Sequence, residues 1–209
     1  MTGLQLRETC HVMDDCTMAL ADVLRGARVV PVIRVSDSAA ALDVLGRVAE
    51  AGLPAAELTA TTHGWADALA EARLRWPGLL TGLGTVVTAA DARRAAGLGA
   101  RFLVSPYPVT EVRDVAADAG LPFIEGGVTP AEIAAAASRG IAKLFPAHVG
   151  GIQYLRSLLS ILPDALIVPT GGIAAAAAAD WLRAGALAVG VGRALLDGDV
   201  DANLAGLRA

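Results

Sequence analysis

The sequence contains very little lysine and few aromatic residues. Of its 17 basic residues only Lys143 is a lysine, and the rest are arginines. Aromatic residues make up 4% of the chain and no basic stripe runs between them, so nucleic acid is not an expected partner. No uninterrupted apolar run reaches about 18 residues, so no membrane-spanning helix is expected either.

Cysteine is also scarce, with Cys10 and Cys16 as the two examples. Two cysteines do not make a disulfide framework, and in a reducing compartment both are expected to be free thiols. The first 15 residues carry three acidic side chains and lack the apolar core of a signal peptide, which predicts a cytoplasmic location. A metal held by Cys10, His11 and Cys16 is the disfavoured alternative, because this set matches no ligand motif.

Apolar residues, in contrast, are abundant and follow a regular alternation. Hydrophobic residues make up 55%, charged residues 18%, and the formal net charge is −4. Short β-branched runs predict strands at residues 28–35, 55–59, 79–84, 101–105, 122–125, 141–145, 165–169 and 186–191. Segments rich in alanine and leucine predict helices at 38–51, 65–75, 89–97, 110–119, 130–139, 151–162 and 174–184.

This alternation of strands and helices is typical of a (β/α)8 barrel, an α/β fold. A leader over residues 1–26, with a helix at about 14–25, precedes the first strand, and a last helix must fit in the tail from residue 194. We therefore expect residues 1–209 to form a single TIM-barrel domain with a short N-terminal helix. A doubly wound open sheet is the alternative, although no Gly-x-Gly-x-x-Gly follows the first strand.

Lys143 lies in an apolar run, GIAKLFPA at 140–147. A lysine is seldom fully buried without a partner or a chemical role. Burial disfavours the ammonium form, which frees the amine to attack a carbonyl and form a Schiff base. From this residue alone, a strand-end lysine that reaches solvent or a structural ion pair is an equal alternative.

Polar residues fall where the predicted strands end, the edge at which the catalytic residues of such barrels gather. They include Arg34, Glu57, Thr59, Thr61, Thr62, Thr85, Ser105, Glu125, Lys143 and Thr170. After the last two strands, Gly171, Gly172, Gly190 and Gly192 let the backbone approach an anion, and Arg193 adds a cationic donor. These loops favour a phosphate site over ordinary tight turns.

Several of these segments together resemble one family. They are VPVIR at 30–34, E-x-T-x-TT at 57–62, GxGTV at 82–86, SP at 105–106, KLFPA at 143–147 and PTGGI at 169–173. From about residue 29 to 196, the chain resembles the 2-keto-3-deoxy-6-phosphogluconate (KDPG) aldolases and their 6-phosphogalactonate relatives. The resemblance implies a metal-free class I aldolase without a cofactor, on a (β/α)8 barrel that is commonly a homotrimer.

The resemblance also implies roles for individual residues. Lys143 matches the Schiff-base lysine, and Glu57 matches the glutamate that acts as general acid and base. Arg34 is assigned to the carboxylate of the substrate, supported by Thr61 and by Thr85. The other expected substrate-binding residues are Pro106, Phe145, Gly171, Gly172, Gly190, Gly192 and Arg193.

Four positions depart from the family pattern. Glu125 replaces a usual proline, and we expect it to place a second carboxylate at the barrel mouth, where it could face Lys143. Tyr107 replaces a smaller residue, and His148 stands where glutamate or serine is common. Gly192-Arg193 leaves open which residue replaces the family's phosphate-binding serine.

These observations predict a lyase. It would cleave a KDPG-like 2-keto-3-deoxy-6-phospho-sugar acid to pyruvate and glyceraldehyde 3-phosphate through a Schiff base on Lys143. One alternative is a broader pyruvate aldolase, for example on 4-hydroxy-2-oxoglutarate. Another is a non-catalytic barrel that binds phosphate or keto acids, but Lys143, Glu57 and Thr85 together favour an enzyme.

Overall fold

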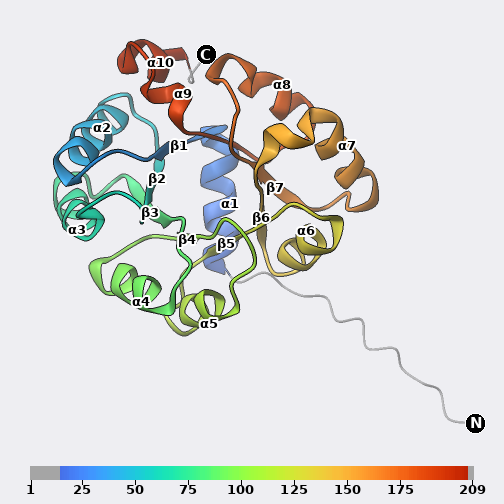
Figure 1. Cartoon of the computed structure of the whole chain (residues 1–209), viewed down its shortest axis with the longest axis horizontal. Coiled ribbons are helices and arrows are strands. Elements are labelled where there is room, and N and C mark those ends of the chain that lie inside the picture. Colours follow the sequence, from blue (N-terminus) through green and yellow to red (C-terminus); the bar gives the residue numbers. More distant parts are fainter. Residues whose placement is uncertain (1–14, 207–209) are drawn as a thin grey trace, which may run out of the picture.

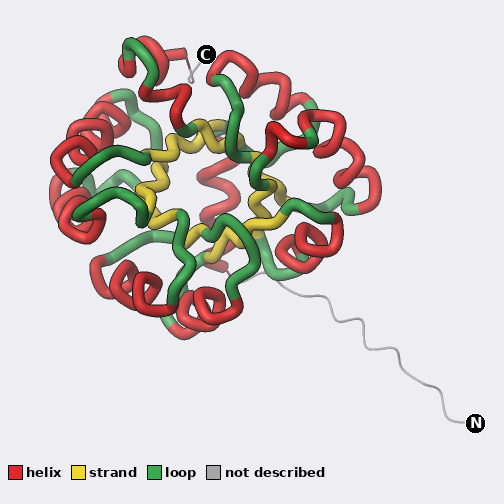
Figure 2. Tube along the Cα trace, viewed as in Figure 1, coloured by secondary structure: helices red, strands yellow, loops and turns green. Residues whose placement is uncertain are grey.

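A computed structural model describes residues 15–206, and these contain eight parallel strands in a nearly closed barrel (Figure 2). Neighbouring strands follow the order β7-β6-β5-β4-β3-β2-β1-β8. The two ends of this series meet where Leu187 N donates to Ile167 O and where Thr170 bridges to Gly190. The predicted (β/α)8 barrel is therefore confirmed. The strands are β1 Val29–Ile33, β2 Ala55–Thr59, β3 Leu80–Gly84, β4 Leu103–Val104, β5 Phe123–Gly127, β6 Ile141–Leu144, β7 Leu166–Pro169 and β8 Val189–Val191.

Helices surround the strand ring on its outside (Figure 1). Their starts follow from the capping residues: the Asp37 side chain accepts a hydrogen bond from Ala40 N, and Thr129 forms a capping box with Glu132. The α-helices are α1 Asp15–Ala27, α2 Ser38–Glu50, α3 Trp65–Arg75, α4 Ala89–Leu98, α5 Thr110–Asp118, α6 Pro130–Ala137, α7 Gly151–Ile161, α8 Ala178–Arg183, α9 Arg193–Leu196 and α10 Val200–Gly206. Two 3-10 turns, η1 Ala147–Val149 and η2 Ala175–Ala177, precede α7 and α8.

The alanine-rich stretch at 174–184 is not the continuous helix that was predicted. Ala174 has extended backbone, the 3-10 turn η2 follows, and α8 begins only at Ala178. Ile173 is buried immediately before this stretch, and the high helix propensity of alanine does not make the stretch helical from its first residue. At the other end of the chain, α1 falls close to the predicted leader helix, whereas Cys10 and His11 lie outside the described residues.

The helix α1 covers the amino-terminal end of the barrel, and Figure 1 shows it across the centre of the strand ring. Its buried residues Leu20, Ala21 and Leu24 join a cluster with side chains from the strands and from the residues that precede them. These partners include Val30, Ala55, Ile141, Leu187 and Ala188. Apolar side chains therefore fill the interior at the amino-terminal end of the barrel. The polar interior residues lie nearer the carboxyl ends of the strands.

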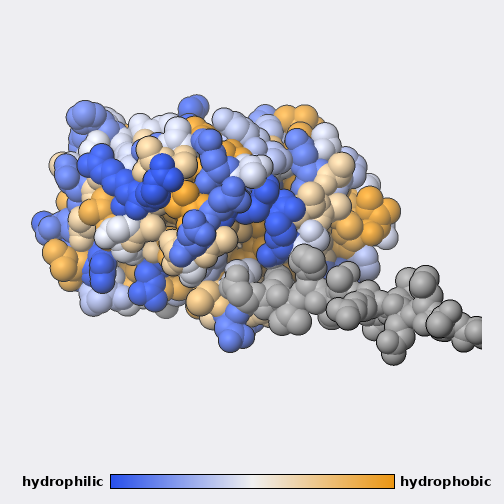
Figure 3. All heavy atoms as spheres, turned by 90° about the horizontal axis from the view of Figure 1, so that it is seen from below, coloured by the Kyte–Doolittle hydropathy of each residue, from blue (hydrophilic) through white to orange (hydrophobic). Residues whose placement is uncertain are grey.

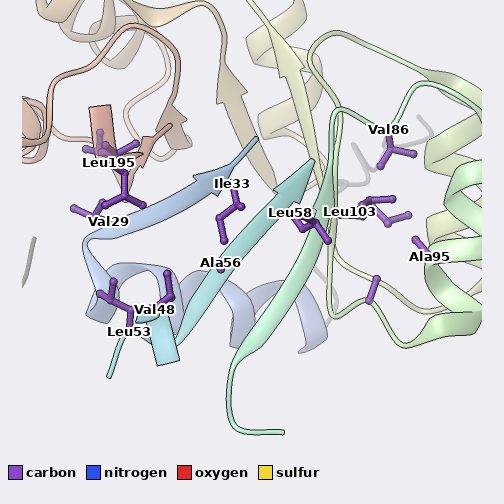
Figure 4. Close-up of a cluster of buried hydrophobic side chains, with 14 of the residues drawn as sticks. Val29, Ile33, Val48, Leu53, Ala56, Leu58, Val86, Ala95, Leu103 and Leu195 are labelled. Atoms are coloured by element: carbon purple, nitrogen blue, oxygen red, sulfur yellow. The ribbon is translucent and has the colours of Figure 1, made fainter. Parts of the chain in front are cut away.

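A second, larger apolar layer lies between the strands and the surrounding helices (Figure 4). Ile33, Ala56, Leu58 and Leu103 belong to this layer and are fully buried. Since successive side chains of a strand point to opposite faces, burial of Ala56 and Leu58 on the outside directs Glu57 to the inside. Each such large aliphatic side chain contributes about 1.5–3 kcal/mol when it is buried.

The outer faces of the helices are mixed in character. In the lateral view of Figure 3, hydrophilic side chains cover much of the centre, with apolar residues between them. Within residues 15–206, no helix has the combination of length and apolar character that a membrane crossing requires.

Candidate active site

Lys143 and Glu57 meet in the interior of the barrel, from β6 and β2. Lys143 Nζ donates to Glu57 Oε1 at 3.1 Å and to Oε2 at 3.4 Å. Each residue is only 4% exposed. A buried amine in direct contact with a carboxylate can pass a proton to it without an intervening solvent molecule. The two residues that the sequence predicted to be catalytic are thus adjacent, although 86 positions separate them in the chain.

Glycines on β3 and β8 provide the space for Glu57 and for Thr170. A Cβ atom on Gly84 would lie 1.9 Å from Glu57 Oε1, and one on Gly190 would lie 2.3 Å from Thr170 Oγ1. An enclosed cavity of about 10 Å³ adjoins the pair. It is lined by Leu24, Val30, Glu57, Phe102, Val104, Ile124, Lys143, Val168, Thr170 and Gly190.

Thr170 is a site residue to which the sequence analysis gave no role. It is 5% exposed, lies directly after β7 and lines the same cavity as Lys143 and Glu57. The signal that could have found it is the strand alternation: Thr170 follows the inward-facing Val168 by two positions. Its bridge to Gly190 also brings the loops that follow β7 and β8 side by side.

Phe145 and Pro106 lie at the edge of this centre. The ring centroid of Phe145 is 5.5 Å from Lys143 Nζ, within the range of a cation–π contact. Pro106 belongs to the loop after β4, which packs against β5 so closely that a Cβ atom on Gly126 would lie 2.3 Å from the Pro106 carbonyl carbon. Ser105 Oγ holds this loop in place by accepting a hydrogen bond from Gly126 N at 3.2 Å.

Arg34 and Thr85 form a second group at the carboxyl ends of the strands. Arg34 follows β1 and is exposed, and its Nη2 donates to Thr85 Oγ1 at 3.2 Å. Thr85 follows β3 with φ of 58°, a left-handed conformation that is rare for a β-branched residue and costs of order 1–3 kcal/mol. Arg34 and Thr85, both expected to bind the substrate carboxylate, are therefore in contact with each other. Thr61 Oγ1 instead lies 3.1 Å from Thr59 Oγ1.

The two glycine-bearing loops lie next to each other after β7 and β8. Gly171 and Gly172 have φ of 95° and 69°, values that favour glycine. His148 packs on this loop, with Nδ1 3.3 Å from Gly171 O. Gly192 follows β8, and Arg193 begins α9 with an exposed side chain. These loops therefore expose backbone and one cation at the barrel end that holds Arg34.

The expectation that Glu125 adds a second carboxylate at the mouth is wrong. Glu125 pairs with Ala142 in the sheet, so it points outward with Ala142, whereas Lys143 points inward. Its carboxylate forms ion pairs with Arg113 of α5 and with Arg139, which follows α6. The predicted strand ended at Glu125, whereas β5 extends to Gly127, so Glu125 lies within the strand and the sheet register decides which face it points to.

The two arginines determine the charge state of Glu125. Burial by itself would raise the pKa of this carboxyl, but hydrogen bonds and charge from Arg113 and Arg139 hold the pKa below its usual value of 4.5. Glu125 is therefore an ionised carboxylate that ties β5 to two helices. Of the other departures from the family pattern, Tyr107 is 54% exposed and His148 is also exposed.

In the part of the chain from 15 to 206, no three His, Cys, Asp or Glu side chains are grouped as metal ligands would be. Two of the three residues of the metal alternative, Cys10 and His11, lie outside that part, and Cys16 is exposed on α1.

Comparison with known proteins gives consistent matches over most of the chain. A family model described as KDPG and KHG aldolase matches residues 20–205. The 2-dehydro-3-deoxy-phosphogluconate aldolase of Pseudomonas aeruginosa is 33% identical over 175 residues, which are 82% of this chain and 80% of the relative.

Two solved structures are similar in fold. The 2-keto-3-deoxy-6-phosphogluconate aldolase of Zymomonas mobilis ZM4 with 3-phosphoglycerate has a TM-score of 0.82 and 27% identity, and the match covers 95% of this chain and 97% of that one. The KDPG aldolase of Legionella pneumophila, with pyruvate captured at low pH as a covalent carbinolamine intermediate, has a TM-score of 0.79 and 26% identity. That match covers 90% of this chain and 93% of the other.

Proposed function

We propose that this chain, which belongs to the KDPG and KHG aldolase family and is thus a lyase, forms an imine on Lys143. Through this imine it cleaves a phosphorylated 2-keto-3-deoxy sugar acid. The products are pyruvate and glyceraldehyde 3-phosphate. The observation that carries the proposal is the buried contact of 3.1 Å between Lys143 Nζ and Glu57 Oε1. It unites a nucleophilic amine with a proton carrier in one apolar-walled interior.

The reaction needs one nucleophile and one proton carrier. The neutral Lys143 amine attacks the C2 ketone, and the carbinolamine loses water to give an iminium. Glu57 takes the proton of the C4 hydroxyl while the C3–C4 bond breaks, and the electron pair of that bond enters the iminium to form an enamine. The aldehyde leaves. Protonation of the enamine at C3 and addition of water then release pyruvate and restore the amine.

Substrate orientation falls to the groups at the carboxyl ends of the strands. Arg34 binds the carboxylate next to the ketone, because a guanidinium matches a carboxylate with two parallel hydrogen bonds. Thr85, which already accepts a hydrogen bond from Arg34, supports it there. The Phe145 ring lies 5.5 Å from Lys143 Nζ, and we assign Phe145 and Pro106 to the walls of the substrate site.

The phosphate belongs at the opposite end of the substrate. Backbone N–H groups of Gly171, Gly172 and Gly192, together with the side chain of Arg193, form the proposed phosphate subsite. The adjacency of the loops after β7 and β8 supports this assignment, since the Thr170–Gly190 bridge holds them together. Gly190 contributes by leaving room for Thr170.

Borohydride trapping with pyruvate tests the imine directly. Because the sequence has one lysine, a reduced adduct must sit on Lys143 or on the N-terminal amine, and peptide mass spectrometry separates the two. We expect the adduct on Lys143 and none in Lys143→Arg, since a guanidinium cannot form the imine. Full turnover by a folded Lys143→Arg protein would contradict the mechanism.

Substrate comparison tests the proposed aldehyde. We expect a higher kcat/KM for KDPG than for 4-hydroxy-2-oxoglutarate, because only the former offers a phosphate to the glycine-bearing loops. Arg193→Ala should narrow this difference. Equal kcat/KM values for both substrates would favour the broader pyruvate aldolase.

Assembly and location complete the proposal. A homotrimer of 21.1 kDa chains has a mass of about 63 kDa, which light scattering would report. The homotrimer and the cytoplasmic location stay predictions that follow from the family resemblance and from the sequence composition.

A further inference from the structure

The backbone around Arg34 is held from both sides by threonine hydroxyls. Thr59 Oγ1 donates to the carbonyl oxygen of Ile33 at 3.1 Å, and Val35 N donates to Thr62 Oγ1 at 3.4 Å. Ile33 and Val35 are the residues immediately before and after Arg34. The side chain of Arg34 is exposed, but its backbone therefore lies between two residues that threonine hydroxyls hold.

These hydroxyls form one buried group. Thr59 Oγ1 lies 3.4 Å from Thr62 Oγ1 and 3.1 Å from Thr61 Oγ1. Thr59 is 0% exposed and Thr62 is 1% exposed, so solvent cannot replace their hydrogen bonds. We refer to Thr59 and Thr62 as the threonine pair.

The threonine pair holds the chain next to the point where the β1–β2 pairing ends. The β1–β2 ladder ends with Ile33 opposite Leu58, so Arg34 and Val35 lie beyond the last paired residues. At the far end of the side chain, the hydrogen bond from Arg34 Nη2 to Thr85 Oγ1 is a single contact of 3.2 Å. This one contact does little to hold the guanidinium, because arginine is a long side chain with many rotamers. A small shift of the Arg34 backbone would therefore displace the guanidinium.

We infer that Thr59 and Thr62 are positioning residues that fix Arg34 for the carboxylate of the 2-oxo acid substrate. The inference rests on the proposed role of Arg34 as the carboxylate ligand. The hydroxyls of Thr59 and Thr62 contact the β1 end and one another, and Thr59 also contacts Thr61. The Lys143 amine contacts Glu57 instead. The threonine pair thus acts on carboxylate recognition rather than on the imine itself.

Isosteric variants test this role. Thr59→Val and Thr62→Val keep the shape of the side chain and remove the hydroxyl, whereas the matching serine variants keep the hydroxyl. The control is Thr81→Val on β3: Thr81 is 4% exposed, and its Oγ1 has no hydrogen-bond partner among the described residues. All three valine variants make the same chemical change inside one sheet.

We expect each threonine-pair valine variant to raise KM by about 10- to 100-fold with a smaller change in kcat, the range that follows when a binding group is displaced by about 1 Å. Thr59→Ser and Thr62→Ser should return KM to within about threefold of the original, because both restore the hydroxyl. Thr81→Val should leave both constants unchanged. Thermal unfolding of every variant identifies any that fail to fold. Thr62→Val serves if Thr59→Val is unfolded, because it removes the contacts of Thr62 with Val35 and Thr59 but keeps the hydrogen bond from Thr59 to Ile33.

Trapping with pyruvate and with its neutral amide, pyruvamide, separates this inference from the proposed function. The original protein should trap pyruvate in preference to pyruvamide, because only pyruvate offers a carboxylate to Arg34. Arg34→Gln should abolish this preference in borohydride trapping, and the threonine-pair valine variants should reduce it. If Arg34→Gln keeps the preference, the carboxylate role of Arg34 fails, and this inference fails with it. If Arg34→Gln abolishes the preference while folded Thr59→Val and Thr62→Val retain it, the inference alone is wrong.

Discussion

The substitution Glu125→Gln distinguishes the role of Glu125 from that of Glu57, which is also a buried carboxylate. Glu125 faces the helices and forms ion pairs with Arg113 and Arg139, whereas Glu57 faces Lys143. Glutamine keeps the shape of the side chain and one acceptor oxygen but removes the charge. We therefore expect Glu125→Gln to lower the free energy of unfolding and to leave kcat close to that of the original protein.

The size of the loss follows from the exposure of the partners. The Glu125 side chain is 3% exposed, while those of Arg113 and Arg139 are 27% and 38% exposed. Breaking a fully buried ion pair costs about 3–5 kcal/mol because a charge stays behind without a partner. Here the remaining charges can reach water, so the value for one hydrogen bond to a charged group, about 1.5–3 kcal/mol, is the better guide. For a domain of this size, at about 2–4 °C per kcal/mol, that corresponds to a Tm lower by about 3–12 °C.

The loss depends on pH with a definite sign. Because Arg113 and Arg139 hold the pKa of folded Glu125 below its usual value of 4.5, the carboxylate stabilises the fold fully at pH values above that usual value. This stabilisation disappears as the pH falls through the lowered folded pKa. The difference in unfolding free energy between the original protein and Glu125→Gln should thus be constant from pH 6 to 8 and shrink below pH 4.

Urea unfolding at several pH values, together with steady-state kinetics on two or more aldehydes, measures both effects. Arg113→Ala and the double variant give the coupling energy of the pair. Should Glu125→Gln keep its stability but lose turnover with every aldehyde, the outward orientation of Glu125 and its structural role would both be refuted.

Two substitutions test the interior pair, and a chelator tests the proposed mechanism. Glu57→Gln should slow turnover by about 10²–10⁴-fold in steady-state kinetics, the usual range for a lost general acid–base group, and an unchanged kcat would contradict its role. Gly84→Ala should lower kcat by about 100-fold, because the new methyl group would lie 1.9 Å from Glu57 Oε1 and displace it from Lys143. Its control is Gly97→Ala in α4, where an added Cβ atom would have no atom within 4 Å apart from the backbone of its own helix. This variant should retain activity and gain about 0.5–1 kcal/mol in unfolding free energy. EDTA should leave the rate unchanged, since imine chemistry requires no Lewis acid, and loss of activity that a divalent metal restores would overturn the mechanism.

The amino-acid sequence by itself determined the order of the elements and the chemistry available to them. The alternation of β-branched runs with alanine-rich segments predicted the barrel, because strand and helix periodicities are local properties of the chain. The single lysine in an apolar run left a reactive amine and a strand-end or ion-paired lysine as equal alternatives, since the cost of burying an ammonium group applies whatever the surrounding fold. The resemblance of the KLFPA motif to the KDPG aldolases then predicted an imine-forming role for this amine.

Tertiary structure decided which side chains meet. Only the barrel brings Glu57 of β2 next to Lys143 of β6, and only the sheet register turns Glu125 away from both. A shift of one position along a strand reverses the face of the sheet, and sequence predicts strand ends to within a few residues, so the direction of Glu125 was beyond its reach. The contacts of Thr59 and Thr62 with the residues around Arg34 were equally invisible, because they join segments that become neighbours only when β1 and β2 pair.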